Sequence, residues 1–188
     1  MEEEVARVMQ GNSVTQTSEV NIRTTMEPGD VGYVIYLHGV LYAREYGLDR
    51  TFEGGVAQRF GEFAKQYDPG KDLFAVAELE GRIVGSIVID GLDDDTAMLR
   101  YFLLHPDARG RGLGRELMNR ALAFCRERGF RTVKLWTITE LKAAAHLYQD
   151  FGFVCTFEKT HEIWGATRTE REYELILQPG DQPETDKQ

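Results

Sequence analysis

The segment ARGRGLGREL at residues 108–117 combines residue types that suit the binding of an anion. Three arginines and three glycines nearly alternate in it: Arg109, Gly110, Arg111, Gly112, Gly114 and Arg115. Glycines let the backbone approach a ligand closely, and free N–H groups at the start of a helix favour negative charge. Arginines add fork-shaped donors that match phosphate oxygens. The pattern predicts a phosphate-binding loop, although a solvated basic loop would have the same composition.

The spacing of the glycines narrows the kind of phosphate ligand. A nucleotide-hydrolysing loop needs GxxxxGK followed by Ser or Thr, which is absent, and GRGLGR departs from GxGxxG because its third glycine comes one residue early. Residues 109–114 instead have the pattern RxxGxG, between an apolar segment and an amphipathic helix. This spacing disfavours nucleotide hydrolysis and dinucleotide binding.

A second segment, LYQDFGF at residues 147–153, contains Tyr148. A phenol has an ordinary pKa of about 10, so it is protonated at neutral pH and can donate a proton to a leaving group. The helical spacing of Ala144, Leu147, Tyr148 and Phe151 is equally that of a tyrosine packed in a core. Periodicity alone leaves both interpretations of Tyr148 open.

The two segments together resemble the GNAT superfamily of acetyltransferases. The resemblance extends to the order of elements over residues 20–177, and it implies acetyl-CoA (coenzyme A) as co-substrate, without a metal. It implies that the loop from Arg109 to Gly114, which includes Leu113, holds the diphosphate of acetyl-CoA together with Arg115. Three further segments, HGVLYAREYG (38–47), ALAFCRERGF (121–130) and LWT (135–137), are similar to acetyltransferase domains fused to MarR-type regulators. The first 17 residues are too few for the winged helix of such a regulator, so no DNA-linked role is expected.

The resemblance also implies roles along the pantetheine arm of the cofactor. The fourth strand would diverge from the fifth, and the backbone of Phe102, Leu103 and Leu104 would bind the pantetheine like an added strand. An N–H near Leu103 would stabilise the developing oxyanion. Tyr148 would contact the cofactor and protonate the departing thiolate.

One position departs from the family pattern. The family often has an asparagine that contacts the cofactor seven residues before the tyrosine, and this chain has Leu141 there. The contact is either lost or replaced by Lys142 or His146, and Leu141 is compatible with packing beneath the cofactor arm. We therefore keep Leu141 among the expected cofactor-binding residues.

The first helix is expected to line the acceptor pocket, as it does in the resembled family. The residues that we expect to contact the acceptor are His38, Tyr42, Glu45 and Tyr46. Glu45 and Glu78 are both candidates for accepting the proton of the amine. Arg44 favours an amine that carries a carboxylate, whereas an inward Glu45 favours a polyamine-like cation, so both acceptor classes stay open.

The resulting functional hypothesis is an N-acetyltransferase that moves the acetyl group of acetyl-CoA to a primary amine of a small molecule, by direct transfer in a ternary complex. One alternative is a non-catalytic acyl-CoA sensor or partner-binding module on the same fold. Another is acetylation of a protein N-terminus or lysine, which needs an open acceptor groove.

Hydrophobic periodicity predicts the elements that position these residues. Strands are expected at 19–26, 72–79, 82–90, 96–105, 131–138, 153–161 and 168–177, and helices at 31–46, 51–67, 113–128 and 140–152. Asp30 is expected to cap the first helix, and Gly129 to end the third. The order β-α-α-β-β-β-α-β-α-β-β predicts an α+β (mixed α/β) fold, with a central mixed, mostly antiparallel GNAT-like sheet flanked by helices and one parallel step through residues 98–138.

Length and composition limit the remaining possibilities. The chain has 188 residues and a formal net charge of −9, which suits one domain and argues against general binding of nucleic acid. We expect the domain at 18–178, with disordered tails at 1–17 and 179–188. There is no leader-like segment and no apolar run of about 18 residues, so a cytoplasmic protein without a membrane partner is expected.

The cysteines and histidines suggest structural roles. Cys125 and Cys155 do not form a CxxC pair and are interpreted as small core residues. The histidines lack the spacing of metal ligands, so no metal site is expected. Paired edges of the last two strands are compatible with a homodimer.

Overall fold

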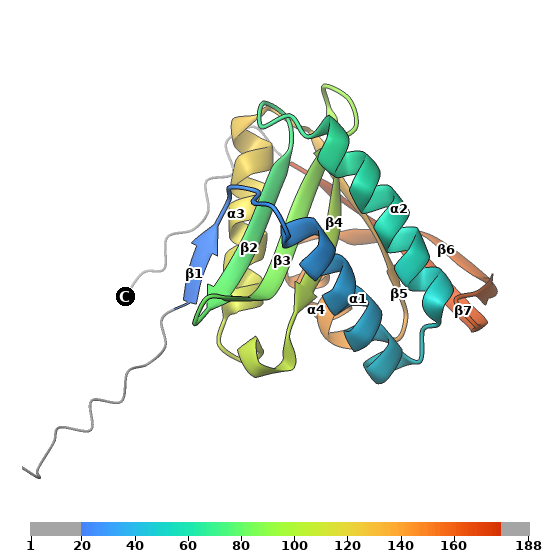
Figure 1. The fold of residues 1–188 in the computed structure, drawn as a ribbon. Helices are drawn as coiled ribbons and strands as arrows, with labels where there is room; N and C mark the ends of the chain where they lie inside the picture. Colours follow the sequence, from blue (N-terminus) through green and yellow to red (C-terminus); the bar gives the residue numbers. More distant parts are fainter. Residues whose placement is uncertain (1–19, 178–188) are drawn as a thin grey trace, which may run out of the picture.

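A mixed sheet forms the centre of the computed structural model, which describes residues 20–177 (Figure 1). The strands lie in the order β1-β2-β3-β4-β5-β7-β6, and every neighbouring pair is antiparallel except β4 and β5. Their bounds are β1 Val20–Arg23, β2 Leu73–Leu79, β3 Arg82–Gly91, β4 Thr96–Leu104, β5 Thr132–Ile138, β6 Val154–Ile163 and β7 Ala166–Ile176. The predicted fold class and element order are confirmed.

The helices cover both faces of this sheet (Figure 1). Helices α1 (Asp30–Tyr46) and α2 (Arg50–Gln66) lie on one face, and α3 (Leu113–Glu127) and α4 (Lys142–Asp150) on the other. A short 3-10 turn, η1 (Pro106–Ala108), follows β4. No helix within residues 20–177 is long and apolar enough to cross a membrane.

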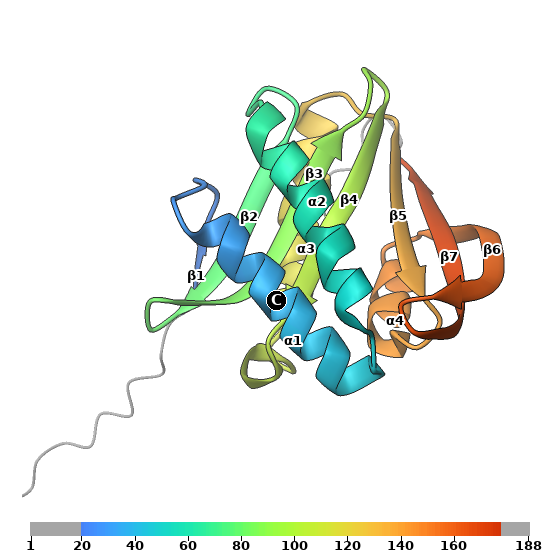
Figure 2. The ribbon, with the colours of Figure 1, turned by 45° about the vertical axis from the view of Figure 1, so that its right-hand side comes forward.

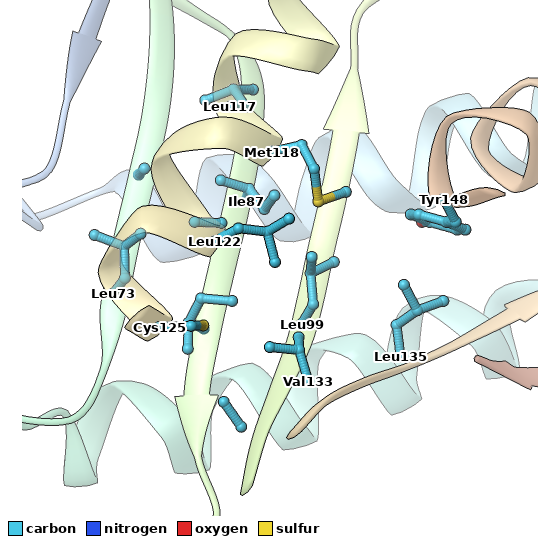
Figure 3. Close-up of a cluster of buried hydrophobic side chains, with 14 of the residues drawn as sticks. Leu73, Ile87, Leu99, Leu117, Met118, Leu122, Cys125, Val133, Leu135 and Tyr148 are labelled. Carbon is cyan, nitrogen blue, oxygen red and sulfur yellow. The ribbon is translucent and has the colours of Figure 1, made fainter. Parts of the chain in front are cut away.

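The apolar face of α3 forms the centre of the larger core (Figure 3). Leu117, Ala121 and Cys125 recur at helical spacing and are fully buried. They pack with Ile87 of β3 and Leu99 of β4. This packing fixes the start of α3, and with it the preceding arginine and glycine loop, against the end of β4.

The fourth and fifth strands diverge (Figure 2). Residues 96–99 of β4 pair with residues 132–135 of β5, after which β5 continues to Ile138 and β4 to Leu104 without pairing to each other. A register shift in the β3–β4 ladder coincides with a left-handed backbone at Tyr101, where φ is 49°. Ser86 Oγ donates a hydrogen bond to the Tyr101 carbonyl at 2.6 Å. The divergence expected from the resemblance is therefore present, and it leaves one edge of β4 open.

Two expectations about single residues are wrong. Gly29, in a left-handed conformation, precedes α1 as its cap, while Asp30 is the first helical residue and its carboxylate pairs with Arg23. Cys155 is exposed because it lies on the edge strand β6, whereas Cys125 is buried as expected. The expected tails at 1–17 and 179–188 lie outside the described residues.

Candidate active site

The arginine and glycine loop joins η1 to the N-terminus of α3. Gly110 and Gly112 both have left-handed backbones, with φ of 74° and 76°, and Gly112 is the cap of α3 without a side chain to occupy the free N–H groups. A Cβ atom at Gly114 would lie 3.2 Å from Leu104 Cδ1 and 3.5 Å from Phe102 Cζ. The glycines thus keep a helix N-terminus open and leave space that a side chain would fill, which suits an anionic group.

The arginines of this loop are held by acidic neighbours. Arg109 donates from Nη2 to Glu45 Oε1 at 2.8 Å and from Nε to the Leu104 carbonyl at 3.0 Å. Arg115 donates to Asp150 at 2.7 Å. These contacts direct two guanidinium groups around the start of α3 before any ligand is bound.

A cavity of about 380 Å³ lies beside the loop. It is bounded by the C-terminal half of α1, the open end of β4, the loop itself and the first turns of α4. Its lining residues are Leu41, Tyr42, Glu45, Tyr46, Phe102, Leu103, Leu104, Arg109, Gly110, Gly112, Gly114, Arg115, Leu141, Ala143, Ala144 and Leu147. We call it the loop cavity.

A second cavity, of about 280 Å³, lies between α1, α2, β4, β5 and the β6–β7 hairpin. Both cavities are lined by Tyr42, Phe102 and Leu141, so they meet at these residues. The second cavity also contains Tyr148 and an aromatic wall, in which the rings of Phe52 and Trp164 are 5.0 Å apart. We call it the aromatic cavity.

Tyr148 stands in the wall of the aromatic cavity, with 4% of its surface exposed. Its ring contacts Phe102, Phe153 and Tyr173, with centroids about 6 Å apart. Burial raises the pKa of its phenol well above the ordinary value, with smaller contributions from Tyr42 and Tyr173. Because its hydroxyl has no hydrogen-bond partner within residues 20–177, Tyr148 is a protonated donor that is free for a ligand.

His38 is an uncharged member of the same wall. Its Nδ1 donates to the Val34 carbonyl at 2.8 Å, which leaves Nε2 as the atom with a lone pair. Burial lowers the pKa of His38 to about 4, so the ring is neutral at pH 7. Two hydroxyls of lining residues, Tyr101 and Thr137, are buried without a partner in the described part of the chain. Unpaired buried hydroxyls are costly, so they favour a ligand or water at this site.

The register of β4 indicates the direction of the backbone N–H groups near the expected oxyanion site. His105 N–H donates to the Val84 carbonyl, and hydrogen-bonded pairs alternate along an antiparallel ladder. Leu103, which is opposite Ser86, therefore directs its N–H to β3. By the same alternation the N–H of Leu104 points to the open edge, which makes Leu104 a further candidate donor beside Leu103.

The structure separates the other residues expected at the site. The loop cavity is lined by Leu141, by the expected residues of β4 and by most of the expected loop residues. Two loop residues lie elsewhere: Arg111 is exposed, and Leu113 is buried in the core. On the acceptor side, His38 and Tyr42 line the aromatic cavity. Glu45 and Tyr46 line the loop cavity instead, because they lie one helical turn closer to the C-terminus of α1 than Tyr42.

Two other candidate groups lie elsewhere. Glu78, considered as a proton acceptor, pairs with Arg23 of β1 at 2.8 Å and lines neither cavity. Lys142 and His146, considered as replacements for the missing asparagine, are exposed and line neither cavity. Leu141 lines both cavities. Within residues 20–177, no group of three or more His, Cys, Asp or Glu side chains is placed to hold a metal ion.

Several lining residues were not expected from the sequence. Phe52 and Val56 belong to the apolar face of α2, and this periodicity was the available signal for them. Trp164 and Glu170 come from the β6–β7 hairpin. No local pattern marked them, because only the fold of the hairpin beside α2 brings them to the cavity.

Comparison with known proteins agrees with this geometry. Residues 31–153 match the model of the Acetyltransferase (GNAT) family. The chain belongs to this family. An uncharacterized N-acetyltransferase of Methanocaldococcus jannaschii is 35% identical over 44% of this chain and 39% of its own length. The mycothiol acetyltransferase of Cellulomonas flavigena is 36% identical over 48% of this chain and 28% of its own. The matched part thus spans less than half of these curated relatives.

Solved structures share the fold of this acetyltransferase-family domain. A Salmonella typhimurium protein, solved with its cofactor acetyl-CoA, has a TM-score of 0.64 at 20% identity and covers 89% of this chain and 99% of its own. The spermidine N-acetyltransferase of Vibrio cholerae, solved with CoA and spermine, also has a TM-score of 0.64 at 20% identity, over 85% and 96% of the two chains. At these identities the likeness is one of fold.

Proposed function

We propose that this protein is an acetyl-CoA-dependent N-acetyltransferase that acts on a primary amine of a small molecule by direct transfer in a ternary complex. The observation that carries the proposal is the junction of the two cavities. An anion-binding loop stands at one end, the aromatic cavity at the other, and the phenol of Tyr148 lines the aromatic cavity near their shared wall. Such an arrangement allows both substrates to be bound at once, as direct transfer requires.

The loop cavity fits the cofactor. Helix N-terminal amides with Arg109 and Arg115 would hold the diphosphate, and the open edge of β4 would bind the amide-rich pantetheine arm through its main chain. The missing Cβ of Gly114 leaves the space that this arm needs. Acetyl-CoA supplies the activated acetyl group, and the chain orients it.

The residues around the junction would then assist the transfer. The N–H of Leu104, at the open edge of β4, can donate to the thioester oxygen as negative charge develops on it. Tyr148 can donate its proton to the departing sulfur. The raised pKa keeps the phenol protonated at neutral pH, so a proton is present beside the sulfur as negative charge develops on it.

The shape of the aromatic cavity favours a small acceptor. Phe52 of α2 meets Trp164 of the β6–β7 hairpin and stacks on Tyr42 of α1, so aromatic rings from three elements bound the cavity. A volume of about 280 Å³ suits an amino acid or a short amine better than a folded protein surface. A polyamine remains within this class, as in the Vibrio cholerae relative named for spermidine.

Thiol release from acetyl-CoA tests the proposal, with a panel of amino acids, polyamines, aminoglycosides and peptides as acceptors. We expect turnover with a small amine and a loss of about 100-fold or more in kcat for Tyr148→Phe, with little change in KM for acetyl-CoA. Tyr36→Phe, on the exposed side of α1, is the matched control. Full activity of Tyr148→Phe would remove the acid role. Tight CoA binding without turnover across the panel would instead indicate an acyl-CoA sensor, and turnover with peptides alone a protein acetyltransferase.

A further inference from the structure

An acceptor amine must lose a proton before its nitrogen can attack. Alkylamines have a pKa of about 10, like lysine, so most of the amine is ammonium at neutral pH. The titratable side chains that line the aromatic cavity are His38, Tyr42, Arg59, Arg100, Tyr101, Tyr148 and Glu170. Glu170 is the sole carboxylate among them. Glu170 is therefore the first candidate for a proton acceptor in the aromatic cavity.

Glu170 is held in place by a neighbouring histidine. It lies on β7 opposite Ile138 of β5, at the end of the strand that diverges from β4. His161 of β6 lies beside it, with Nε2 2.6 Å from Glu170 Oε2. The second oxygen, Oε1, has no partner among residues 20–177. The cavity thus presents one oriented carboxylate with one oxygen available.

His38 is the other basic group of this wall, and burial makes it the poorer proton acceptor. It has 3% of its surface exposed and stacks on Tyr42. Protonation would place a positive charge on a buried ring, which the low pKa of about 4 reflects. Protonation of a carboxylate removes a charge instead, so loss of solvent opposes proton uptake by a histidine and not by a carboxylate.

We infer that Glu170 is a catalytic residue that removes the proton of the acceptor ammonium, and that His161 positions it. The inference rests on the proposed function of this site and names a further residue for it. One N–H bond of the ammonium breaks as an O–H bond forms on Glu170, and this proton leaves to solvent. The nitrogen lone pair then forms the C–N bond while the C–S bond breaks. After the C–N bond has formed, the nitrogen loses a second proton. This proton restores the phenol of Tyr148, which has given its own proton to the sulfur.

The inference is tested with amines of similar shape and falling basicity. Ethylamine, fluoroethylamine, difluoroethylamine and trifluoroethylamine form such a series, and the last is mostly neutral at pH 7. If Glu170 removes the proton, Glu170→Gln loses about 100-fold in kcat/KM with ethylamine, and this loss shrinks steadily along the series. A carboxylate that only supports the fold would give the same loss with every amine.

Two further variants complete the experiment. Glu172→Gln is the matched control, because Glu172 lies on the same strand and the same face but outside the cavity. Glu170→Asp keeps a carboxylate and should recover part of the lost rate. CoA affinity, measured by calorimetry, should match the wild type in all three variants, which shows that they are folded.

The possible failures are distinct. No loss in Glu170→Gln, or an equal loss with all four amines, would overturn the role of Glu170 while leaving the acetyltransferase proposal in place. No turnover by the wild-type protein with this series or with the acceptor panel, despite CoA binding, would overturn the proposed function itself and with it the need for a proton acceptor.

Discussion

The guanidinium of Arg109 bridges Glu45 at the end of α1 and the carbonyl of Leu104 at the end of β4. All three residues line the loop cavity, so this contact ties together two of its walls. Glu45 also offsets the charge of a residue that is proposed to bind a diphosphate. The pair therefore orients Arg109 at some cost in its attraction for an anion.

This relationship predicts the effect of removing the charge of Glu45. We expect Glu45→Gln to bind CoA about threefold more tightly, because Arg109 keeps its contact with Leu104 while a carboxylate near the diphosphate is lost. The gain should shrink as salt is added, since both side chains are partly exposed. Calorimetry at low and high salt measures both effects. Glu116→Gln, which removes a similar exposed pair on α3 with Arg120, is the control, and weaker CoA binding by Glu45→Gln would contradict the prediction.

Two glycines of the loop should respond differently to alanine. At Gly112 the left-handed backbone disfavours any Cβ, so Gly112→Ala should lower the free energy of unfolding by about 1 kcal/mol. At Gly114 the backbone is helical and alanine is favourable for the helix, but its Cβ would crowd Leu104 at the edge of the loop cavity. Gly114→Ala should therefore keep or raise stability and weaken CoA binding about fivefold.

Chemical denaturation and calorimetry on both variants check this contrast. If Gly114→Ala bound CoA like the wild type, the cofactor would not use the space beside Leu104. If Gly112→Ala were as stable as the wild type, the loop would have relaxed to another conformation.

The residues that we propose for the cofactor side could be grouped from the sequence more easily than those proposed for the acceptor side. Most of residues 109–115 lie together at one cavity because they form a single loop with a glycine-dependent backbone. The acceptor side is assembled from distant segments. The position of Glu170 opposite Ile138 depends on strand register, and the place of Glu45 at the loop cavity depends on how α1 packs beside β4. Neither the register nor this packing is encoded in a local pattern.

The two cysteines should differ in their reaction with thiol reagents. Cys155 is exposed on β6, whereas Cys125 is buried beneath α3, where burial raises the pKa of its thiol to about 12. A maleimide or disulfide reagent should label one thiol in the folded protein and a second one only after denaturation. Cys155→Ser is the control and should remove the rapid reaction. Rapid labelling of Cys125 in the native protein would show that the core around α3 opens readily.

The buried His38 should make stability depend on pH. Its pKa of about 4 in the folded protein is below the value of 6.5 for an unperturbed histidine, so the unfolded chain binds the proton more tightly. The stabilising contribution is present above about pH 6.5 and is lost as pH falls toward 4. A shift of this size corresponds to about 3 kcal/mol across that range.

Urea denaturation between pH 7 and pH 4 measures this dependence in the wild type and in His38→Gln. The variant lacks the titrating ring, so its free energy of unfolding should fall less steeply over this range. An equal slope in the wild type and His38→Gln would mean that the ring takes up its proton without unfolding, and that the wall of the aromatic cavity tolerates a charge there.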